Sequence, residues 1–253
     1  MAAYNFGYRP RDFKYENMSK VGDFRNTLFE YKMKSNGAYL FVRFPTSGGS
    51  NLGVVGQACV LASSNVRNFR GRFLGIARKI FESGYSFRGD HYHKDEACVV
   101  FLFPDREAAI KFFVSDKNFK QPDFPPPAGA CEAWTIDRYY TPEDEADYST
   151  FMISEIRLTK GSYLDLKHQF ASPFANMMLD HAAHPFVVQT DDIHSLRRHY
   201  KDPHTVVNVH LFRTPSQMGQ IMKDYRYDSL QRIQNELGSE YHTVFTLDPE
   251  ACP

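Results

Sequence analysis

The sequence lacks several features that would assign the protein to a broad class. It has no apolar run near the roughly 20 residues that span a bilayer, and its longest candidates are short, such as residues 39–44. It also carries no net charge, because 30 basic residues balance 30 acidic ones. Neutrality gives no reason to expect a nucleic-acid partner or an acidic membrane surface. We therefore expect no nucleic-acid binding and no membrane insertion.

Cysteine is scarce, with four residues and no CxxC pair. Cys59, Cys98 and Cys131 fall in predicted strands, and Cys252 is the penultimate residue. This pattern favours buried free thiols over a disulfide framework. The first residues contain acids and no apolar signal-peptide core, so we expect a cytoplasmic or other reducing intracellular compartment.

The common catalytic loop motifs are missing as well. The sequence contains no nucleophile elbow, no phosphate-binding glycine loop and no dinucleotide fingerprint. Gly48 and Gly49 lack the lysine and the helix of a phosphate loop, and Gly71 and Gly75 lie inside a predicted helix. The sequence therefore predicts the architecture of the protein better than its chemistry.

Apolar and aromatic residues are abundant, at 42% and 15% of the 253 residues. This length accommodates two domains of roughly 100 residues and an arm. Residues 1–35 alternate aromatic and charged side chains without a helical or strand period. They are therefore expected to form an extended arm.

The remainder of the chain contains two segments that echo each other. Residues 97–103 form an apolar run that is followed by a capped turn and a helical pattern, and residues 206–212 begin the same series. We predict the order β-α-β-β-α-β twice. The expected domains are the arm at 1–35, a ferredoxin-like first repeat with an extra N-terminal β-hairpin strand at 36–140, and a ferredoxin-like second repeat at 148–250.

In the first repeat, the turn-rich residues 46–51 separate two β-rich runs, the second of which is expected to start the repeat. Ser63 or Ser64 can cap a helix that continues to about Ser83, with apolar residues at helical spacing. Asp105 is expected to cap the next helix. The predicted strands are residues 39–44, 54–61, 85–88, 97–103 and 131–136.

In the second repeat, Thr214, Pro215 and Gln217 fit the first positions of a capped helix. Pro173 falls inside the helical region of residues 163–183 and predicts a kink or a restarted helix there. A final short helix is expected from Asp228. The predicted strands are residues 151–158, 186–190, 205–212 and 241–247.

The predicted order is that of the ferredoxin-like split βαβ motif, in which both helices cover one face of a four-stranded antiparallel sheet. The strands carry large apolar residues at consecutive positions, as in residues 99–103, which indicates that both sheet faces are covered. The expected fold class is α+β. It comprises two tandem ferredoxin-like units that form an intramolecular dimeric-type α/β barrel, with the extended N-terminal arm.

A family resemblance rests on dispersed residues of the first repeat. They are residues 84–89 (GYSFRG), Phe103-Pro104, Glu107 to Ala109, Phe112-Phe113, and Ser115-Asp116 before Phe119. With these residues, positions 54–248 resemble the dimeric α/β-barrel superfamily, and the first repeat is most similar to the family named domain of unknown function 1330. The second repeat departs from the pattern, because residues 185–189 lack the Arg-Gly pair. Relatives in the superfamily include cofactor-free monooxygenases, isomerases, haem-binding decarboxylases and dismutases, and domains with no established activity, so the resemblance implies a fold and no single function.

His181 is one candidate for chemistry. It continues the apolar stripe of Phe170, Phe174 and Met177 at helical spacing, so we expect its ring to point toward the sheet or the barrel. A buried imidazole can serve as an acid, a base or a haem ligand. A hydrogen-bonded core histidine is the competing interpretation.

Glu155 and Trp134 are further weak catalytic candidates. Glu155 is a carboxylate in an otherwise apolar strand, and Trp134 is the only indole. A Glu155 side chain that faces the barrel can act as a general base with a raised pKa. Strand alternation equally allows it to face solvent or to form an ion pair at a sheet edge.

His91 and His93 are weak candidates for a metal site. Their alternation in a strand-like segment can place both imidazoles on one side of a hairpin. Zinc needs three or four convergent ligands, and a polar hairpin loop explains the same residues. We therefore expect no metal.

Two functions remain open at this point. The first is a non-catalytic binding or scaffold protein, whose arm and sheet edges contact protein partners in an assembly. The alternative is a small-molecule enzyme or carrier, either a cofactor-free oxygenase or isomerase or a haem-binding protein, that binds a small hydrophobic ligand in the barrel cavity. No cofactor is expected for the first function, and haem belongs only to the alternative.

Overall fold

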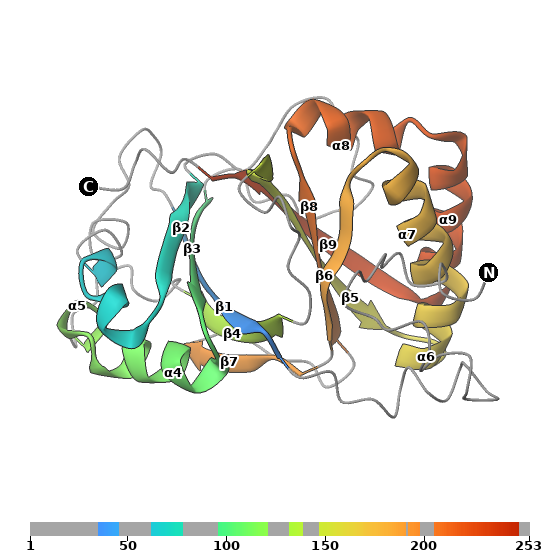
Figure 1. Cartoon of the computed structure of the whole chain (residues 1–253). Helices are drawn as coiled ribbons and strands as arrows, with labels where there is room; N and C mark the ends of the chain where they lie inside the picture. The colour runs from blue at the N-terminus through green and yellow to red at the C-terminus, as the bar shows by residue number, and fades with distance from the viewer. Residues whose placement is uncertain are drawn as a thin grey trace, which may run out of the picture.

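The computed structural model describes residues 35–45, 62–77, 96–120, 132–138, 147–190, 192–197 and 205–247. Within these residues the strands form two antiparallel sheets that face each other across the centre of the molecule (Figure 1). Helices lie on the outer sides of both sheets. The predicted α+β class is confirmed.

The first sheet is built mainly from the N-terminal half of the chain. Its strand order is β2-β3-β1-β4-β7, and every neighbouring pair is antiparallel. The strands are β1 (Gly37–Pro45), β2 (Arg72–Ala77), β3 (Glu96–Phe103), β4 (Glu132–Arg138) and β7 (His194–Arg197). The short strand β7 comes from the second half, so the two halves share this sheet.

The second sheet has the order β6-β8-β5-β9. Its strands are β5 (Thr150–Leu158), β6 (His184–Thr190), β8 (Thr205–Phe212) and β9 (Gly238–Thr246). Apart from β7, both sheets place their strands in the order second, third, first, fourth along the chain. This is the order of the ferredoxin-like split βαβ motif.

The helices of the first half follow β3. Asp105 accepts a hydrogen bond from the backbone N–H of Ala108 at 2.7 Å and thereby caps α4 (Arg106–Ser115), as predicted. The single turn α5 (Lys117–Lys120) continues from it, and a 3₁₀ turn, η2 (Val66–Phe69), lies before β2. The first sheet therefore has one substantial helix among its described residues.

The second half is richer in helix. Its helical elements are α6 (Tyr163–Leu166), the π-helical turn η5 (Lys167–Ala171), α7 (Ser172–Asp180), α8 (Pro215–Met222) and α9 (Tyr225–Leu237). Pro173 lies in the first turn of α7. The backbone stays helical from α6 through η5 into α7, since Leu166, Ala171 and Ser172 all have right-handed helical dihedral angles, so the helix does not restart at Pro173. The π-helical turn η5 is the distortion that precedes the proline. Thr214 caps α8 as predicted, whereas α9 begins three residues before the predicted start because Asp224 caps it.

Strand alternation divides the apolar side chains into three layers. The central layer, between the two sheets, contains Tyr39, Phe41, Trp134, Phe151 and Val209. The first helix–sheet layer lies between the first sheet and α4, and the second helix–sheet layer lies between the second sheet and α6 to α9. Full burial of each large apolar side chain contributes about 1.5–3 kcal/mol, so these layers hold the fold together.

The predicted helix from Ser63 or Ser64 to Ser83 is wrong. Over the described residues 64–77, the chain makes the short turn η2 and then enters β2, which pairs with β3. Arg70 adopts a left-handed backbone with φ of 56°, and a Cβ on Gly71 would lie 2.5 Å from a ring carbon of Phe103. This tight bend turns the chain from helix into strand.

The expected start of the first unit also needs correction. The run 39–44 is not an extra strand before the unit, because β1 occupies the centre of the first sheet between β3 and β4. Residues 54–61 and 85–88 and the N-terminal arm lie outside the described residues. The duplication of the two halves stays a prediction.

Two smaller expectations can be compared with the structure. Cys98 is buried in β3, as predicted, whereas the other three cysteines lie outside the described residues. In the described part of the chain, no helix is long and apolar enough to cross a membrane.

Candidate functional site

Polar side chains interrupt the helix-facing side of the second sheet. In β8, Val207 and Val209 belong to the central layer, whereas Val206 and Phe212 belong to the second helix–sheet layer. Asn208 and His210 alternate with the valines and therefore face the helices. Ser154 of β5 is the register partner of Asn208, so the polar positions lie side by side on the two central strands.

The same face of the first sheet is apolar on β1 and β3, the strands that occupy the places of β5 and β8 in the shared strand order. Its residues there are Leu40, Val42, Phe44, Val99, Phe101 and Phe103. A helix-covered sheet of this strand order therefore needs no polar residue at these positions. Asn208, His210 and Ser154 are a property of the second half and not of the fold.

Asn208 is fully buried, with 0% of its surface exposed. Among the described residues, neither its Nδ2 nor its Oδ1 has a hydrogen-bond partner. Gln234 of α9, which is on the buried side of that helix, also has an Nε2 atom without a partner in the described structure. A buried polar group without a partner lowers the stability of the fold by about 1–3 kcal/mol, so these carboxamides destabilise the ligand-free protein.

His210 supplies a titratable group in the same layer. Its side chain is buried, and its ring lies against that of Phe174 of α7, with 5.2 Å between the centroids. Ser154 donates its hydroxyl hydrogen bond to the carboxylate of Glu240 on β9. An imidazole beside these polar groups is a possible proton donor or acceptor.

The layer around these groups is deformable. Met152, Met177, Met178 and Met218 are buried in it, and methionine side chains adapt readily to irregular space. The helix that covers the layer contains the π-helical turn η5, a distortion that is frequent at functional sites. These features would allow the layer to open for a small molecule.

Lys167 and Tyr227, on the helical elements beside this layer, have shifted pKa values. Burial lowers the pKa of Lys167, in η5, to about 8, and its ammonium lies 5.6 Å from the centroid of the Tyr163 ring. Burial, together with the Glu240 carboxylate, raises the pKa of the Tyr227 phenol on α9. Perturbed groups of this kind gather at functional sites and also in structural networks.

His181 does not point into the protein core, so that part of the prediction is wrong. Helix α7 ends at Asp180, and His181 is the next residue, with 27% of its side chain exposed. Its Nε2 lies 3.0 Å from Oδ2 of Asp224, the N-cap of α9. Asp224 also binds Arg226 at 2.7 Å, so His181 belongs to a brace between α7 and α9.

Glu155 and Trp134 both lie between the two sheets. Trp134 stacks on Phe41 with 4.4 Å between the ring centroids, as part of the filled central layer. Glu155 faces the first sheet, where Arg43 lies 3.4 Å away, and Arg43 also binds Glu132 at 2.7 Å. The structure therefore places Glu155 in an ion pair that links the sheets. His181 is on the other side of the second sheet, so the three predicted residues do not converge.

The two predicted metal ligands, His91 and His93, lie outside the described residues. Within the described ranges, no group of three or more histidine, cysteine, aspartate or glutamate side chains is placed to hold a metal ion.

The haem alternative needs an axial histidine beside a space that is wide enough for a porphyrin. His210 faces the second helix–sheet layer, but the ring of Phe174 lies against its own. Phe170 stacks on Phe174 at 5.0 Å, and both phenylalanines are buried. The side chains of this layer therefore do not fit haem.

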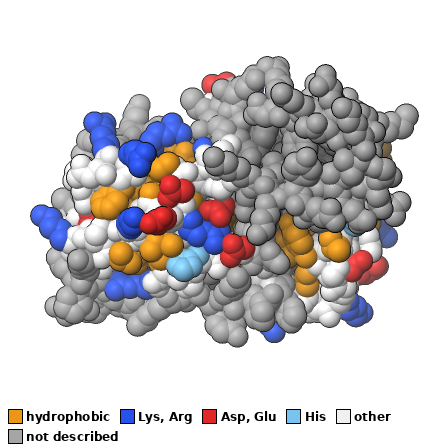
Figure 2. Space-filling model, turned by 60° about the horizontal axis from the view of Figure 1, so that its bottom comes forward, with side chains coloured by type: hydrophobic (Ala, Val, Ile, Leu, Met, Phe, Trp, Pro, Cys, Tyr) orange, Lys and Arg blue, Asp and Glu red, His pale blue; other side chains and the backbone are white. Residues whose placement is uncertain are grey.

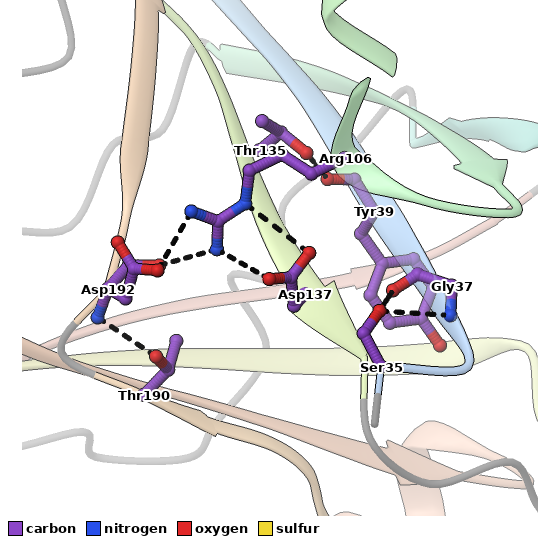
Figure 3. A network of polar contacts seen from close by, with 8 residues as sticks. All are labelled: Ser35, Gly37, Tyr39, Arg106, Thr135, Asp137, Thr190 and Asp192. Carbon is purple, nitrogen blue, oxygen red and sulfur yellow. Dashed lines mark hydrogen bonds and ion pairs between the residues drawn. The ribbon is translucent and has the colours of Figure 1, made fainter. Parts of the chain in front are cut away.

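A separate polar network joins the two halves of the chain (Figure 3). Arg106, at the start of α4, binds Asp137 of β4 at 3.0 Å and Asp192 of the β6–β7 connection at 2.8 Å. Burial raises the pKa of Asp137, while the guanidinium of Arg106 opposes that rise. The network fixes the connection from which β7 reaches the first sheet, which is a structural role.

The surface of the first half offers weaker candidates. On the face in Figure 2, acidic and basic side chains stand next to each other rather than in a field of one sign. A polar hollow of about 480 Å³ lies by η2 and α5. Asp116 at its base accepts hydrogen bonds from Nδ2 of Asn65 at 2.9 Å and the backbone N–H of Asn118 at 2.8 Å. These contacts brace η2 against α5, which accounts for the buried carboxylate.

Comparisons with known proteins find similarity in fold only. No protein-family model matches the chain, and no curated protein matches it. Membership of the family named domain of unknown function 1330 is therefore not confirmed.

Solved structures that resemble the chain include an anthrone oxidase-like protein, with 8% identity and a TM-score of 0.48 over 86% of this chain and 94% of that one. A dye-decolorizing protein from V. cholerae has 10% identity and a TM-score of 0.47, over 86% and 95% of the two chains. A mutant chlorite dismutase from Candidatus Nitrospira defluvii has 9% identity and a TM-score of 0.40, over 90% and 95%. These neighbours are dimeric α/β-barrel proteins. At such identities and TM-scores they assign neither an activity nor a cofactor to this chain.

Proposed function

We propose that this protein is an enzyme or carrier that binds a small, largely apolar molecule between the second sheet and helices α7 and α9. The observation that carries the proposal is Asn208, whose carboxamide is completely buried and has no partner among the described residues. A ligand that hydrogen-bonds this carboxamide would offset its cost of about 1–3 kcal/mol per unpaired group. The methionines and phenylalanines around it suit the apolar body of such a ligand.

The contrast between the two halves supports this location. The helix-facing residues of β1 and β3 are apolar, and the buried hydroxyl of Thr135 on β4 has its hydrogen bond made. Selection for stability alone would therefore favour apolar or hydrogen-bonded residues in the second layer too. Natural proteins depart from such local rules mainly at functional sites. The central layer contains stacked aromatic side chains, whereas the second helix–sheet layer contains methionines, which adapt readily to irregular space.

His210 decides between the two forms of the proposal. A carrier needs only the carboxamide of Asn208 and the apolar surroundings. An enzyme needs a group that moves a proton, and His210 lies two residues along the same strand and faces the same layer. Replacing His210 with glutamine would therefore abolish turnover by an enzyme and leave binding by a carrier nearly unchanged.

The proposal includes the architecture. The shared strand order and the common central layer support two ferredoxin-like units of one duplicated chain that join as an intramolecular α/β barrel. The scaffold function depends on the N-terminal arm, which lies outside the described residues, and it stays a prediction.

The test is binding of a bicyclic aromatic probe, naphthol, measured by ligand-detected NMR with the full chain. We expect Asn208→Val to weaken binding at least tenfold, because the variant cannot hydrogen-bond the probe. Thr135→Val is the matched control, since Thr135 is equally buried but its hydroxyl already donates to the carbonyl of Tyr39 at 2.7 Å. Absence of binding to the wild-type chain, or equal loss in both variants, would contradict the proposed site.

A further inference from the structure

The chemistry of Asn208 also restricts what the ligand can be. A carboxamide presents a donor, Nδ2, and an acceptor, Oδ1, in one plane. Both atoms are buried and without a partner among the described residues. A ligand that hydrogen-bonds only one of these atoms leaves the other with its full desolvation penalty.

From this geometry we infer that the ligand presents a hydrogen-bond acceptor and a donor side by side, as a lactam, a cyclic imide or an aminopyridine edge does. The inference rests on the proposed function and adds the chemical class of the bound molecule. Paired hydrogen bonds from an asparagine side chain to such an edge are a known mode of recognition, as in the contact of asparagine with adenine.

Other ligand classes match the site less well. A carboxylate can only accept hydrogen bonds, so Oδ1 of Asn208 would stay unpaired. An ether, an ester or a ketone also lacks a donor, so it too would leave Oδ1 of Asn208 unpaired. A single hydroxyl has one hydrogen to donate and cannot span both amide atoms in the plane of the carboxamide as a lactam does.

The surroundings agree with a flat ring that carries this edge. The rings of Phe174 and His210 meet at an angle of 58°, with 5.2 Å between their centroids, and Phe170 stacks on Phe174. Aromatic side chains of this kind pack well against a planar ligand. The register places Ser154 and Gln189 on the strands to either side of Asn208, so the ligand edge would lie over the middle of the second sheet.

The experiment compares two ligands of the same shape. Isoquinolone is a lactam with an N–H beside its carbonyl, and isocoumarin has a ring oxygen in place of that N–H. Dissociation constants for both are measured by calorimetry with the wild-type chain, with Asn208→Val and with Thr135→Val. This comparison needs no variant for its first result, so it remains decisive even if Asn208→Val does not fold.

We expect isoquinolone to bind the wild-type chain about 10- to 100-fold more tightly than isocoumarin, because the lactone leaves Oδ1 without a donor. Asn208→Val should remove that preference, and Thr135→Val should retain it. Equal affinity for the two ligands, or no binding of isoquinolone, would overturn the inference. Should naphthol still bind in an Asn208-dependent way, the proposed function would stand without the lactam class. Should naphthol also fail to bind, both would fall.

Discussion

Replacing Asn208 with valine should stabilise the ligand-free protein, which is unusual for a substitution in a protein core. The change removes two buried polar atoms that have no partner among the described residues. It introduces a β-branched residue into a strand that already carries valine at three of its eight positions. Most core substitutions destabilise, so a gain in stability would be diagnostic of the unpaired carboxamide.

The size of the effect follows from the cost of an unpaired buried group. Removal of the carboxamide recovers about 2–6 kcal/mol, because its donor and its acceptor each cost about 1–3 kcal/mol when unpaired. The larger valine offsets part of this gain, since overpacking a core costs about 1–3 kcal/mol. We expect a net gain of about 1–2 kcal/mol. For a chain of this length, that gain raises the melting temperature by roughly 2–8 °C.

The assay is urea unfolding of both proteins, on samples in which native mass spectrometry detects no bound small molecule. The control is Thr135→Val, which removes a hydroxyl whose hydrogen bond to Tyr39 is made, and it should lose about 1 kcal/mol. If the free energy of unfolding falls as much in Asn208→Val as in Thr135→Val, the carboxamide has a hydrogen-bond partner in the protein, such as an ordered water. The reasoning behind the proposed site would then be refuted.

Three further predictions concern charged groups. Arg43→Met should cost about 3 kcal/mol in urea unfolding, because it leaves the 14%-exposed carboxylate of Glu155 against the central layer, whereas Glu155→Gln should cost about 1 kcal/mol because Arg43 retains Glu132. The hydrogen bond from Arg226 holds the pKa of Asp224 well below its usual range. Wild type should therefore be more stable than Asp224→Asn above pH 4, and this difference should shrink as pH falls below about 4, through the folded pKa. Lys167, with a pKa lowered to about 8, releases its proton earlier in the folded chain than in the unfolded one. Thermal unfolding should therefore show wild type gaining stability relative to Lys167→Met as pH rises from about 8 to 10.4.

Each of these predictions has a contrary result. Equal losses for the Arg43 and Glu155 variants would mean that the guanidinium does not compensate a buried charge. A wild-type advantage over Asp224→Asn that is the same at pH 3 and pH 7 would mean that the Asp224 carboxylate is not stabilised in the folded state. A flat difference between wild type and Lys167→Met above pH 8 would mean that the Lys167 ammonium is solvated.

Much of the fold follows from local sequence signals. The runs at residues 97–103 and 205–212 are rich in apolar and β-branched residues, which favours buried strands. Asp105 and Thr214 mark helix starts by hydrogen bonds that the structure contains. The failure at residues 63–83 has a physical cause. Phe73 and Ile76 fit a helical period, but they form a strand because they pair with the distant strand β3 and because Gly71 makes a tight contact with Phe103. Both interactions join residues that are about 30 positions apart, so a local sequence pattern does not predict them.

The candidate site was harder to predict. In the sequence, His181 continues an apolar stripe at helical spacing. In the structure, α7 ends one residue earlier, so the His181 ring lies outside the helix and contacts Asp224. Asn208 carried a usable signal, because the run at 206–212 has polar residues at alternate positions and its echo at 99–103 has none. The lack of partners for its side chain depends on packing across the whole layer, which no sequence pattern shows.

The most direct test of the binding site is the side-chain amide signal of Asn208 in a nitrogen–proton correlation spectrum. Its two proton resonances are assigned by their absence in Asn208→Val. We predict that both shift and saturate as isoquinolone is added to the wild-type chain. Binding of isoquinolone that leaves these resonances in place while others move would locate the ligand elsewhere and contradict the account.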